Sequence, residues 1–233
     1  MATKIQTHMT EFPIEGGGTA RGFEARPTCE GVCPAVLVIQ EWWGLNDHIK
    51  DIAHRLAEEG FVALAPDLYG GKVTSDPNQA GACMQALDRE AAVKILRAGF
   101  QFLRENKPVL REHIGVIGFC MGGSYALLLA CRVPSLKAAV AFYGDSPDPI
   151  DQLKNIQCPV LFFGAGKDQW INAAKIEKLK KAFHQYGVNG EVRVYPDANH
   201  AFFNDTRPEV YAAAAAHDAW TRTLGLLSRT LKS

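Results

Sequence analysis

The chain has 233 residues, of which 47% are hydrophobic and 21% are charged, and its 25 basic side chains balance its 25 acidic ones. This composition is that of an ordinary globular protein, and without a basic excess nucleic acid is not expected as a partner. No segment resembles a signal peptide or approaches the roughly 20 apolar residues of a membrane span, so we expect a cytoplasmic protein without membrane contact.

Strand-like and helix-like segments alternate along the chain, which predicts an α/β fold with a mostly parallel central sheet and helices on both faces. Before the midpoint we expect a buried strand over residues 35–40, a helix over 47–59, a strand over 61–65, a surface loop over 70–78, helical structure over 80–105 and a strand over 114–117.

Beyond the midpoint, strands are expected over 137–143, 159–163 and 191–195, and helices over 172–186 and 208–231. No internal repeat, low-complexity tract or long linker interrupts this alternation. Residues 1–233 are therefore expected to form a single domain.

The stretch Gly118-Phe119-Cys120-Met121-Gly122-Gly123 lies between the strand at 114–117 and an apolar helical segment. A nucleophile flanked by glycines at a strand-to-helix turn is the nucleophile elbow G-x-S-x-G, here with cysteine in place of serine. The glycines are needed because the turn brings backbone segments close together. Such a turn exposes the sulfur at the edge of the sheet and places the backbone N–H of Met121 at a helix N-terminus.

A cysteine nucleophile needs a base and a group that orients the base. Asp168 follows the strand at 159–163, and His200 follows the strand at 191–195. The carboxyl ends of parallel strands share one edge of a sheet, so Cys120, Asp168 and His200 are expected to meet there. His200 would take the thiol proton and Asp168 would hold the imidazole.

Each of these residues also has an ordinary interpretation. A cysteine among apolar residues is commonly a packed side chain, and a loop histidine or aspartate is commonly solvated. Their order along the chain, each directly after a strand, favours the catalytic interpretation. Asp197 is a rival for the acid, although its position three residues before His200 suits a turn former. For the oxyanion we expect the N–H groups of Met121 and Trp42.

Five cysteines remain, at positions 29, 33, 83, 131 and 158. Disulfides are not expected in a chain of this length without an export signal. Cys29 and Cys33 have no second pair at zinc-site spacing, so no metal is predicted. Cys131 and Cys158 lie beside apolar residues and are expected to be buried.

These residues resemble the dienelactone hydrolase (carboxymethylenebutenolidase) family, a cysteine branch of the α/β-hydrolase fold. The resemblance covers nearly the whole chain and rests on the following segments: Gln40–Gly44, Ala65–Tyr69, Gly118–Gly123, Phe142–Gly144, Gly164–Asp168 and His200–Phe202. It implies a carboxylic ester hydrolase of EC class 3.1.1, without a cofactor, that opens an enol-lactone through an acyl-enzyme on Cys120. Glu41 would be the family's glutamate that pairs with the resting thiol; the alternative is a surface carboxylate.

The sequence departs from the family pattern where arginines bind the substrate carboxylate. Position 204 is asparagine, and residues 74–84 contain no arginine. Arg207 could reach in from a shifted loop. Because asparagine does not replace bidentate arginine recognition, a larger or less charged lactone or ester is expected. The residues expected around this substrate are Trp42, Trp43, Phe119, Met121, Tyr143, Phe202, Phe203 and Arg207.

Two other functions stay open at this point. The fold could carry an exposed thiol that serves as a redox sensor without catalysis, because fold does not fix function. An acyl transferase would use an alcohol or a thiol in place of water. The sequence carries no signal of oligomeric state, and a monomer is compatible with it.

Overall fold

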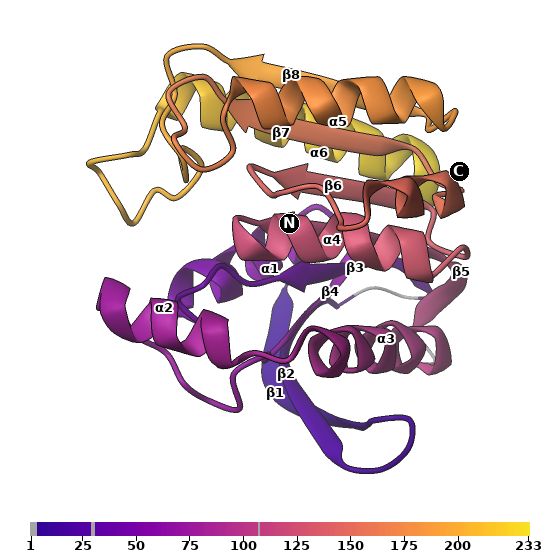
Figure 1. Cartoon of the computed structure of the whole chain (residues 1–233). Coiled ribbons are helices and arrows are strands. Elements are labelled where there is room, and N and C mark those ends of the chain that lie inside the picture. Colours follow the sequence, from indigo (N-terminus) through magenta and orange to yellow (C-terminus); the bar gives the residue numbers. More distant parts are fainter. Residues whose placement is uncertain (1–3, 29–30, 107) are drawn as a thin grey trace. The chain divides into compact units, whose positions relative to one another are not determined.

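The computed structural model describes residues 4–28, 31–106 and 108–233 of the chain. It divides into two compact units, Met1–Gly115 and Val116–Ser233. Strands and helices alternate through both units, as the sequence predicts, and strand β5 (Val109–Phe119) runs from the first unit into the second (Figure 1).

Four strands of the first unit are hydrogen-bonded in the order β1-β2-β4-β3. Their bounds are Ile5–Pro13 for β1, Thr19–Pro27 for β2, Cys33–Ile39 for β3 and Val62–Pro66 for β4. Strands β3 and β4 are parallel and completely buried, whereas β2 is antiparallel to both β1 and β4. A search for apolar runs does not detect β1 and β2, because β1 is mostly exposed and β2 alternates between buried and exposed side chains.

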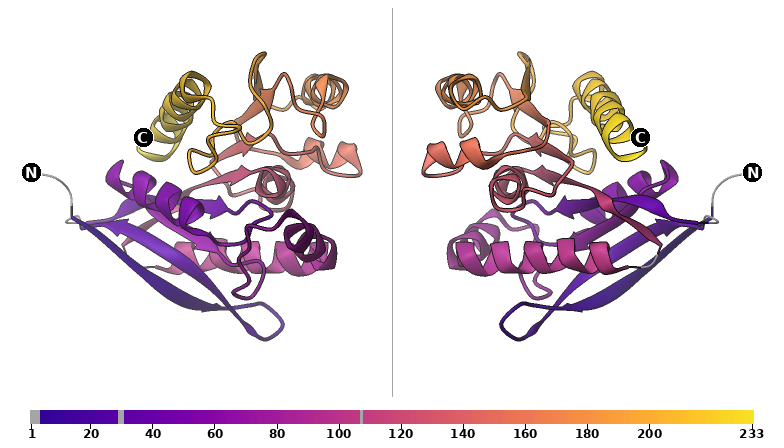
Figure 2. Two further views of the ribbon diagram at one scale, coloured as in Figure 1. Left: turned by 90° about the vertical axis from the view of Figure 1, so that its left-hand side faces the viewer. Right: turned by 90° about the vertical axis from the view of Figure 1, so that its right-hand side faces the viewer.

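Helices α1 (Asp47–Glu58) and α3 (Arg89–Glu105) cover opposite faces of these strands (Figure 2). Helix α2 (Pro77–Ala86) is separate from α3, and the two helices together account for the helical structure expected over residues 80–105. The helical conformation is interrupted at Asp88, whose side chain caps α3 by accepting a hydrogen bond from the N–H of Ala91 at 2.7 Å. A capping carboxylate satisfies an N–H that a helix start leaves unpaired.

In the second unit, strands β6 (Ala138–Phe142), β7 (Val160–Ala165) and β8 (Gly190–Tyr195) are parallel neighbours. Every residue of β6 and β7 is buried. Helices α4 (Met121–Arg132) and α5 (Ala173–Gln185) lie on one face, and α6 (Ala213–Leu231) lies on the other (Figure 2). The 3-10 helix η1 (Ile150–Asn155) precedes β7.

The last helix begins five residues later than the sequence predicts. Residues 206–212 instead form turns, in which the N–H groups of Val210 and Tyr211 both donate to the carbonyl of Arg207. None of the helices within the described residues has the length and apolar character that a membrane span requires.

The cysteines differ from expectation at one position, because Cys33 is disulfide-bonded. Cys29 lies outside the described residues. Cys131 and Cys158 are buried free thiols, which confirms the prediction for both. Burial raises the pKa of each to about 12, so neither is a ready nucleophile at neutral pH.

Candidate active site

Cys120 occupies a sharp turn between β5 and α4, with φ 54° and ψ −118°. Positive φ is costly for a residue with a side chain and is found mostly where function requires it. A Cβ at Gly118 would overlap the carbonyl oxygen of Gly122, so the predicted need for glycine at position 118 is confirmed. The N–H of Cys120 donates to the carbonyl of Phe142 at 3.0 Å, and the residue stays partly exposed.

The start of α4 lies tightly against the segment after β6. A Cβ at Gly123 would come within 2.5 Å of the carbonyl oxygen of Phe142, and a Cβ at Gly144 would overlap the backbone of Gly123. Met121 is the first residue of α4, so its backbone amide lies at the positive end of the helix dipole. This end of the helix favours negative charge beside Cys120.

Asp168 lies just beyond β7 and is 4% exposed. One carboxylate oxygen, Oδ1, accepts hydrogen bonds from the N–H groups of Trp170 and Ile171, at 2.8 and 3.0 Å. The other, Oδ2, lies 2.6 Å from Nδ1 of His200. Burial opposes the charge of Asp168, but these hydrogen bonds and the charge of His200 hold its pKa below the usual value.

His200 follows β8 and connects the acid with the nucleophile. Burial disfavours a charged imidazole, but the hydrogen bonds and electrostatic interactions with Asp168 and Cys120 outweigh burial and raise the pKa of His200 to about 10. With Nδ1 held by Asp168, Nε2 is the nitrogen left to exchange a proton with the sulfur. The second unit therefore contains a Cys-His-Asp arrangement.

The loops that carry the acid and the base are bound to each other. The N–H of Gly166 donates to the carbonyl of Tyr195 at 2.8 Å, and the N–H of Lys167 donates to that of Ala198 at 3.0 Å. Asp197, the rival for the acid, has a side chain 95% exposed that lies 3.7 Å from Nζ of Lys167. The carboxylate beside the imidazole is thus that of Asp168.

Three aromatic residues expected at the substrate are completely buried: Phe119, Tyr143 and Phe202. Phe119 stacks on Phe142 with ring centroids 4.6 Å apart, and Phe202 packs edge-on against Tyr143 at 5.4 Å. The ring of Tyr143 lies 5.0 Å from that of His200. All three side chains are therefore packed inside the protein. Phe203 is also buried.

Asn204 and Arg207 are both engaged within the protein. Asn204 is 1% exposed, and its Oδ1 accepts hydrogen bonds from the N–H and the hydroxyl of Thr206, at 3.1 and 2.7 Å. Arg207 forms an ion pair with Glu209 at 2.8 Å. Asn204 therefore shapes a turn, as asparagine commonly does.

The remaining predicted site residues belong to the first unit and follow β3. Glu41 is 1% exposed, so the alternative of a surface carboxylate is wrong. The rings of Trp42 and Trp43 pack edge-on with centroids 4.9 Å apart, and Trp42 is the more exposed of the two. Gln40 fixes this segment by accepting a hydrogen bond from the N–H of Leu68 at 3.2 Å.

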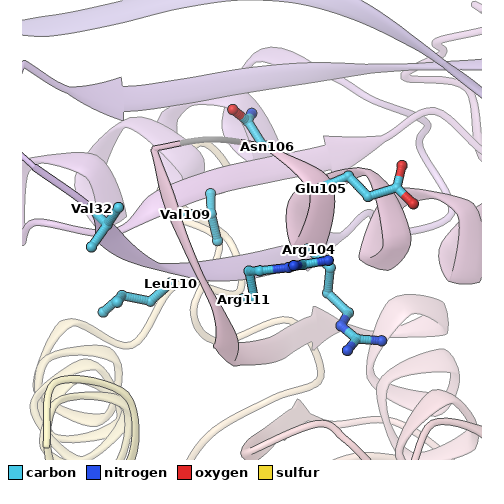
Figure 3. Close-up of a pocket in the computed structure, with 7 residues that line it drawn as sticks. All are labelled: Val32, Arg104, Glu105, Asn106, Val109, Leu110 and Arg111. Carbon is cyan, nitrogen blue, oxygen red and sulfur yellow. The ribbon is translucent and has the colours of Figure 1, made fainter.

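A pocket of about 500 Å³ in the first unit contains none of the predicted site residues. Its lining, drawn in Figure 3, consists of Val32, Arg104, Glu105, Asn106, Val109, Leu110 and Arg111. Arg104 is already paired with Glu112 at 2.9 Å. Within residues 4–28, 31–106 and 108–233, no three His, Cys, Asp or Glu side chains are grouped as metal ligands would be.

Sequence reasoning did not identify Trp170 as part of the site. Its ring lies 5.0 Å from that of His200, at an interplanar angle of 86°, and the residue is 64% exposed. Its position two residues after Asp168 was the available signal, because a short loop beyond a strand end keeps neighbouring residues near the site.

Comparison with known proteins gives consistent matches over nearly the whole chain. A model of the dienelactone hydrolase family matches residues 20–231. "Protein usf" of Aquifex pyrophilus is 37% identical over 96% of this chain and 98% of its own length. A Bradyrhizobium protein named "Probable 2-oxo-3-(5-oxofuran-2-ylidene)propanoate lactonase" is 34% identical, over 89% of this chain and 88% of its own.

A solved structure of similar fold is that of a dienelactone hydrolase-like promiscuous phosphotriesterase from metagenomic libraries. It has a TM-score of 0.88 and 28% sequence identity, and the match covers 97% of this chain and 98% of the other.

Proposed function

The chain belongs to the dienelactone hydrolase family and has its α/β-hydrolase fold, and from this membership we propose that it is a cysteine-dependent carboxylic ester hydrolase. It would open a lactone or cleave an activated ester. The observation that carries the proposal is the link from Cys120 through His200 to the buried Asp168.

The reaction runs in two steps through an acyl-enzyme. The sulfur of Cys120 attacks the carbonyl carbon, a carbon–sulfur bond forms, and the bond from carbon to the ring or ester oxygen breaks. The proton on His200 goes to the departing oxygen. His200 next takes a proton from water, the resulting hydroxide attacks the thioester carbon, and the sulfur leaves with the electron pair of the broken bond.

Backbone donors stabilise the negative oxygen that forms during each attack. The proposal assigns this role to the N–H of Met121, whose place at the start of α4 supports it, and to the N–H of Trp42, which lies in the loop after β3. Glu41 is assigned, by the family resemblance, to pairing with the thiol before substrate arrives, and its side chain is buried.

The proposed substrate is larger or less charged than a small carboxylated lactone. This is supported by Asn204, which lies buried in a turn. Trp43 and Arg207 remain proposed substrate contacts. The name of the Bradyrhizobium relative describes a five-membered oxofuran ring carrying a carboxylate side chain. Five-membered lactones therefore belong in the substrate panel.

We also propose that residues 1–233 work as a single domain, since the family match runs through both units. The test of function is mass spectrometry of protein incubated with aryl acetates and five-membered lactones. An acyl adduct on Cys120, lost together with turnover in Cys120→Ala, is expected. Cys120→Ser should be slower by about 100-fold or more if the site is tuned to a thiolate. Equal turnover in wild type and Cys120→Ala would remove the proposal.

Peroxide treatment tests the redox-sensing alternative on the same protein. A sulfenic acid on Cys120 combined with no turnover of any ester or lactone would favour a sensor over a hydrolase.

A further inference from the structure

Trp170 is the most exposed large hydrophobic side chain among the described residues, with 64% of its surface open. Its ring contacts that of His200, the proposed catalytic base, and the indole and imidazole centroids are 5.0 Å apart. His200 thus has two aromatic neighbours at the same centroid distance, Tyr143 completely buried and Trp170 largely exposed.

The backbone of Trp170 is fixed by the same carboxylate that orients the base. Oδ1 of Asp168 accepts the N–H of Trp170 at 2.8 Å, while Oδ2 holds His200 at 2.6 Å. The next residue, Ile171, is 8% exposed, and its N–H also donates to Oδ1. The indole is therefore carried on a rigid loop whose position is tied to that of the imidazole.

Folding does not explain a tryptophan at this position. A buried tryptophan removes about 150–250 Å² from water, and Trp170 leaves most of its surface in water. Its indole N–H has no acceptor among the residues that the structure describes. An exposed aromatic side chain on a rigid loop beside a reactive group is instead suited to binding a ligand.

Charged side chains near this loop are neutralised by partners. A ligand group at the indole would therefore meet an aromatic ring and paired charges, which favours an uncharged group over a carboxylate. The pairs are Lys167 with Asp197 and Lys175 with Asp145.

The chemistry indicates which part of a substrate reaches Trp170. His200 delivers its proton to the departing oxygen, so the alcohol portion of the substrate must lie against the imidazole when the bond breaks. The indole is next to that imidazole.

We propose that Trp170 is a specificity-determining residue that binds the alcohol portion of the substrate, and that this portion is an uncharged aromatic or extended apolar group. The inference rests on the proposed function of Cys120. Aromatic contacts of this kind are worth about 3- to 10-fold in an equilibrium or rate ratio.

The experiment compares two acetate esters whose alcohols have similar acidity but different shape, 2-naphthyl acetate and hexafluoroisopropyl acetate. In Trp170→Ala, kcat/KM for the naphthyl ester should fall about 3- to 10-fold, while kcat/KM for the fluoroalkyl ester stays within about 2-fold. Trp170→Phe should keep most of the naphthyl preference. Tyr186→Ala is the matched control, because Tyr186 lies at the other end of α5, roughly 20 Å along that helix.

Binding without turnover gives a second measurement. In the Cys120→Ala background, 2-naphthol should quench tryptophan fluorescence, and the additional change Trp170→Ala should weaken that binding by a similar factor.

The outcomes separate the two proposals. If wild type hydrolyses neither ester, the proposed function fails, and the inference fails with it. If wild type is active and Trp170→Ala leaves the ratio of the two esters unchanged, only the role of Trp170 is overturned. An equal loss on both esters with a shifted pH profile would mean that Trp170 acts through His200, which also overturns substrate binding.

Discussion

Gly166 lies so close to Pro196 that a methyl group at position 166 would overlap the carbonyl of Pro196. The two residues precede Asp168 and His200 by two and four positions. Their approach lets the loops after β7 and β8 bind each other through backbone hydrogen bonds. The alignment of acid with base therefore depends on a residue that takes no part in the chemistry.

Substitution of that glycine should separate the two loops. Gly166→Ala is expected to destabilise the protein by about 1–3 kcal/mol, because the backbone of Pro196 must move, and to reduce kcat/KM by at least 10-fold. Urea unfolding and ester hydrolysis measure the two effects. Gly225→Ala is the control, since its nearest neighbour would be a flexible atom of Arg229 at 3.9 Å, and alanine favours helix α6. Normal activity in Gly166→Ala would contradict this role.

Loss of the acid should change the titration of the base. Asp168→Asn removes the charge and the hydrogen bond that raise the pKa of His200, so that pKa should fall from about 10 toward 6.5. We expect kcat/KM to fall by about 10³- to 10⁴-fold, as in other triads, and the alkaline limb of the pH profile to move to lower pH. Asp197→Asn, which changes an exposed carboxylate, should leave the profile in place. The opposite result would make Asp197 the acid.

The raised pKa of His200 also predicts how stability depends on pH. Between pH 6.5 and about 10 the folded protein holds a proton on His200 that the unfolded chain has released. The stabilisation is complete below pH 6.5 and is lost as pH rises through about 10. Urea unfolding at half-unit pH steps should show this decline in wild type and a flatter curve in His200→Gln. Parallel curves for the two proteins would show that His200 has no such shift.

Arginine at position 204 should not restore recognition of a carboxylated lactone. The side chain of Asn204 is buried, and its Oδ1 accepts a hydrogen bond from the N–H of Thr206. Asn204→Arg would bury a charge and remove that acceptor, at a cost of about 3 kcal/mol or more. Asn204→Ser keeps an acceptor and should cost less. Unfolding midpoints and rates on matched lactones with and without a carboxylate test this. A stable arginine variant that gains the carboxylated lactone would refute the assignment of position 204.

The sequence contained enough to place Asp168 and His200 at one edge of parallel strands, because strand ends obey a general rule of the fold. Cys120 was identifiable because its flanking glycines report a tight turn. Close approaches between distant segments, such as that of Gly144 to Gly123, could not be predicted from the sequence, because they depend on tertiary positions rather than on local pattern.

Other features could not be predicted from the sequence for different physical reasons. The edge hairpin of β1 and β2 is half solvated, so it lacks the apolar run by which buried strands are recognised. Phe119 and Phe202 are aromatic residues beside catalytic ones, and only the three-dimensional packing shows that they face inward. Trp170 is the reverse case, a residue without any motif that lies at the surface beside His200.

The backbone at Cys120 limits which nucleophiles this protein lineage could ever have adopted. At φ 54° and ψ −118°, a side chain that branches at Cβ is strongly disfavoured. The turn therefore disfavours threonine at this position, although its hydroxyl is a competent nucleophile elsewhere. Serine and cysteine, unbranched and small, are the exchangeable alternatives, so a switch between oxygen and sulfur chemistry requires retuning the neighbours and no rebuilding of the turn.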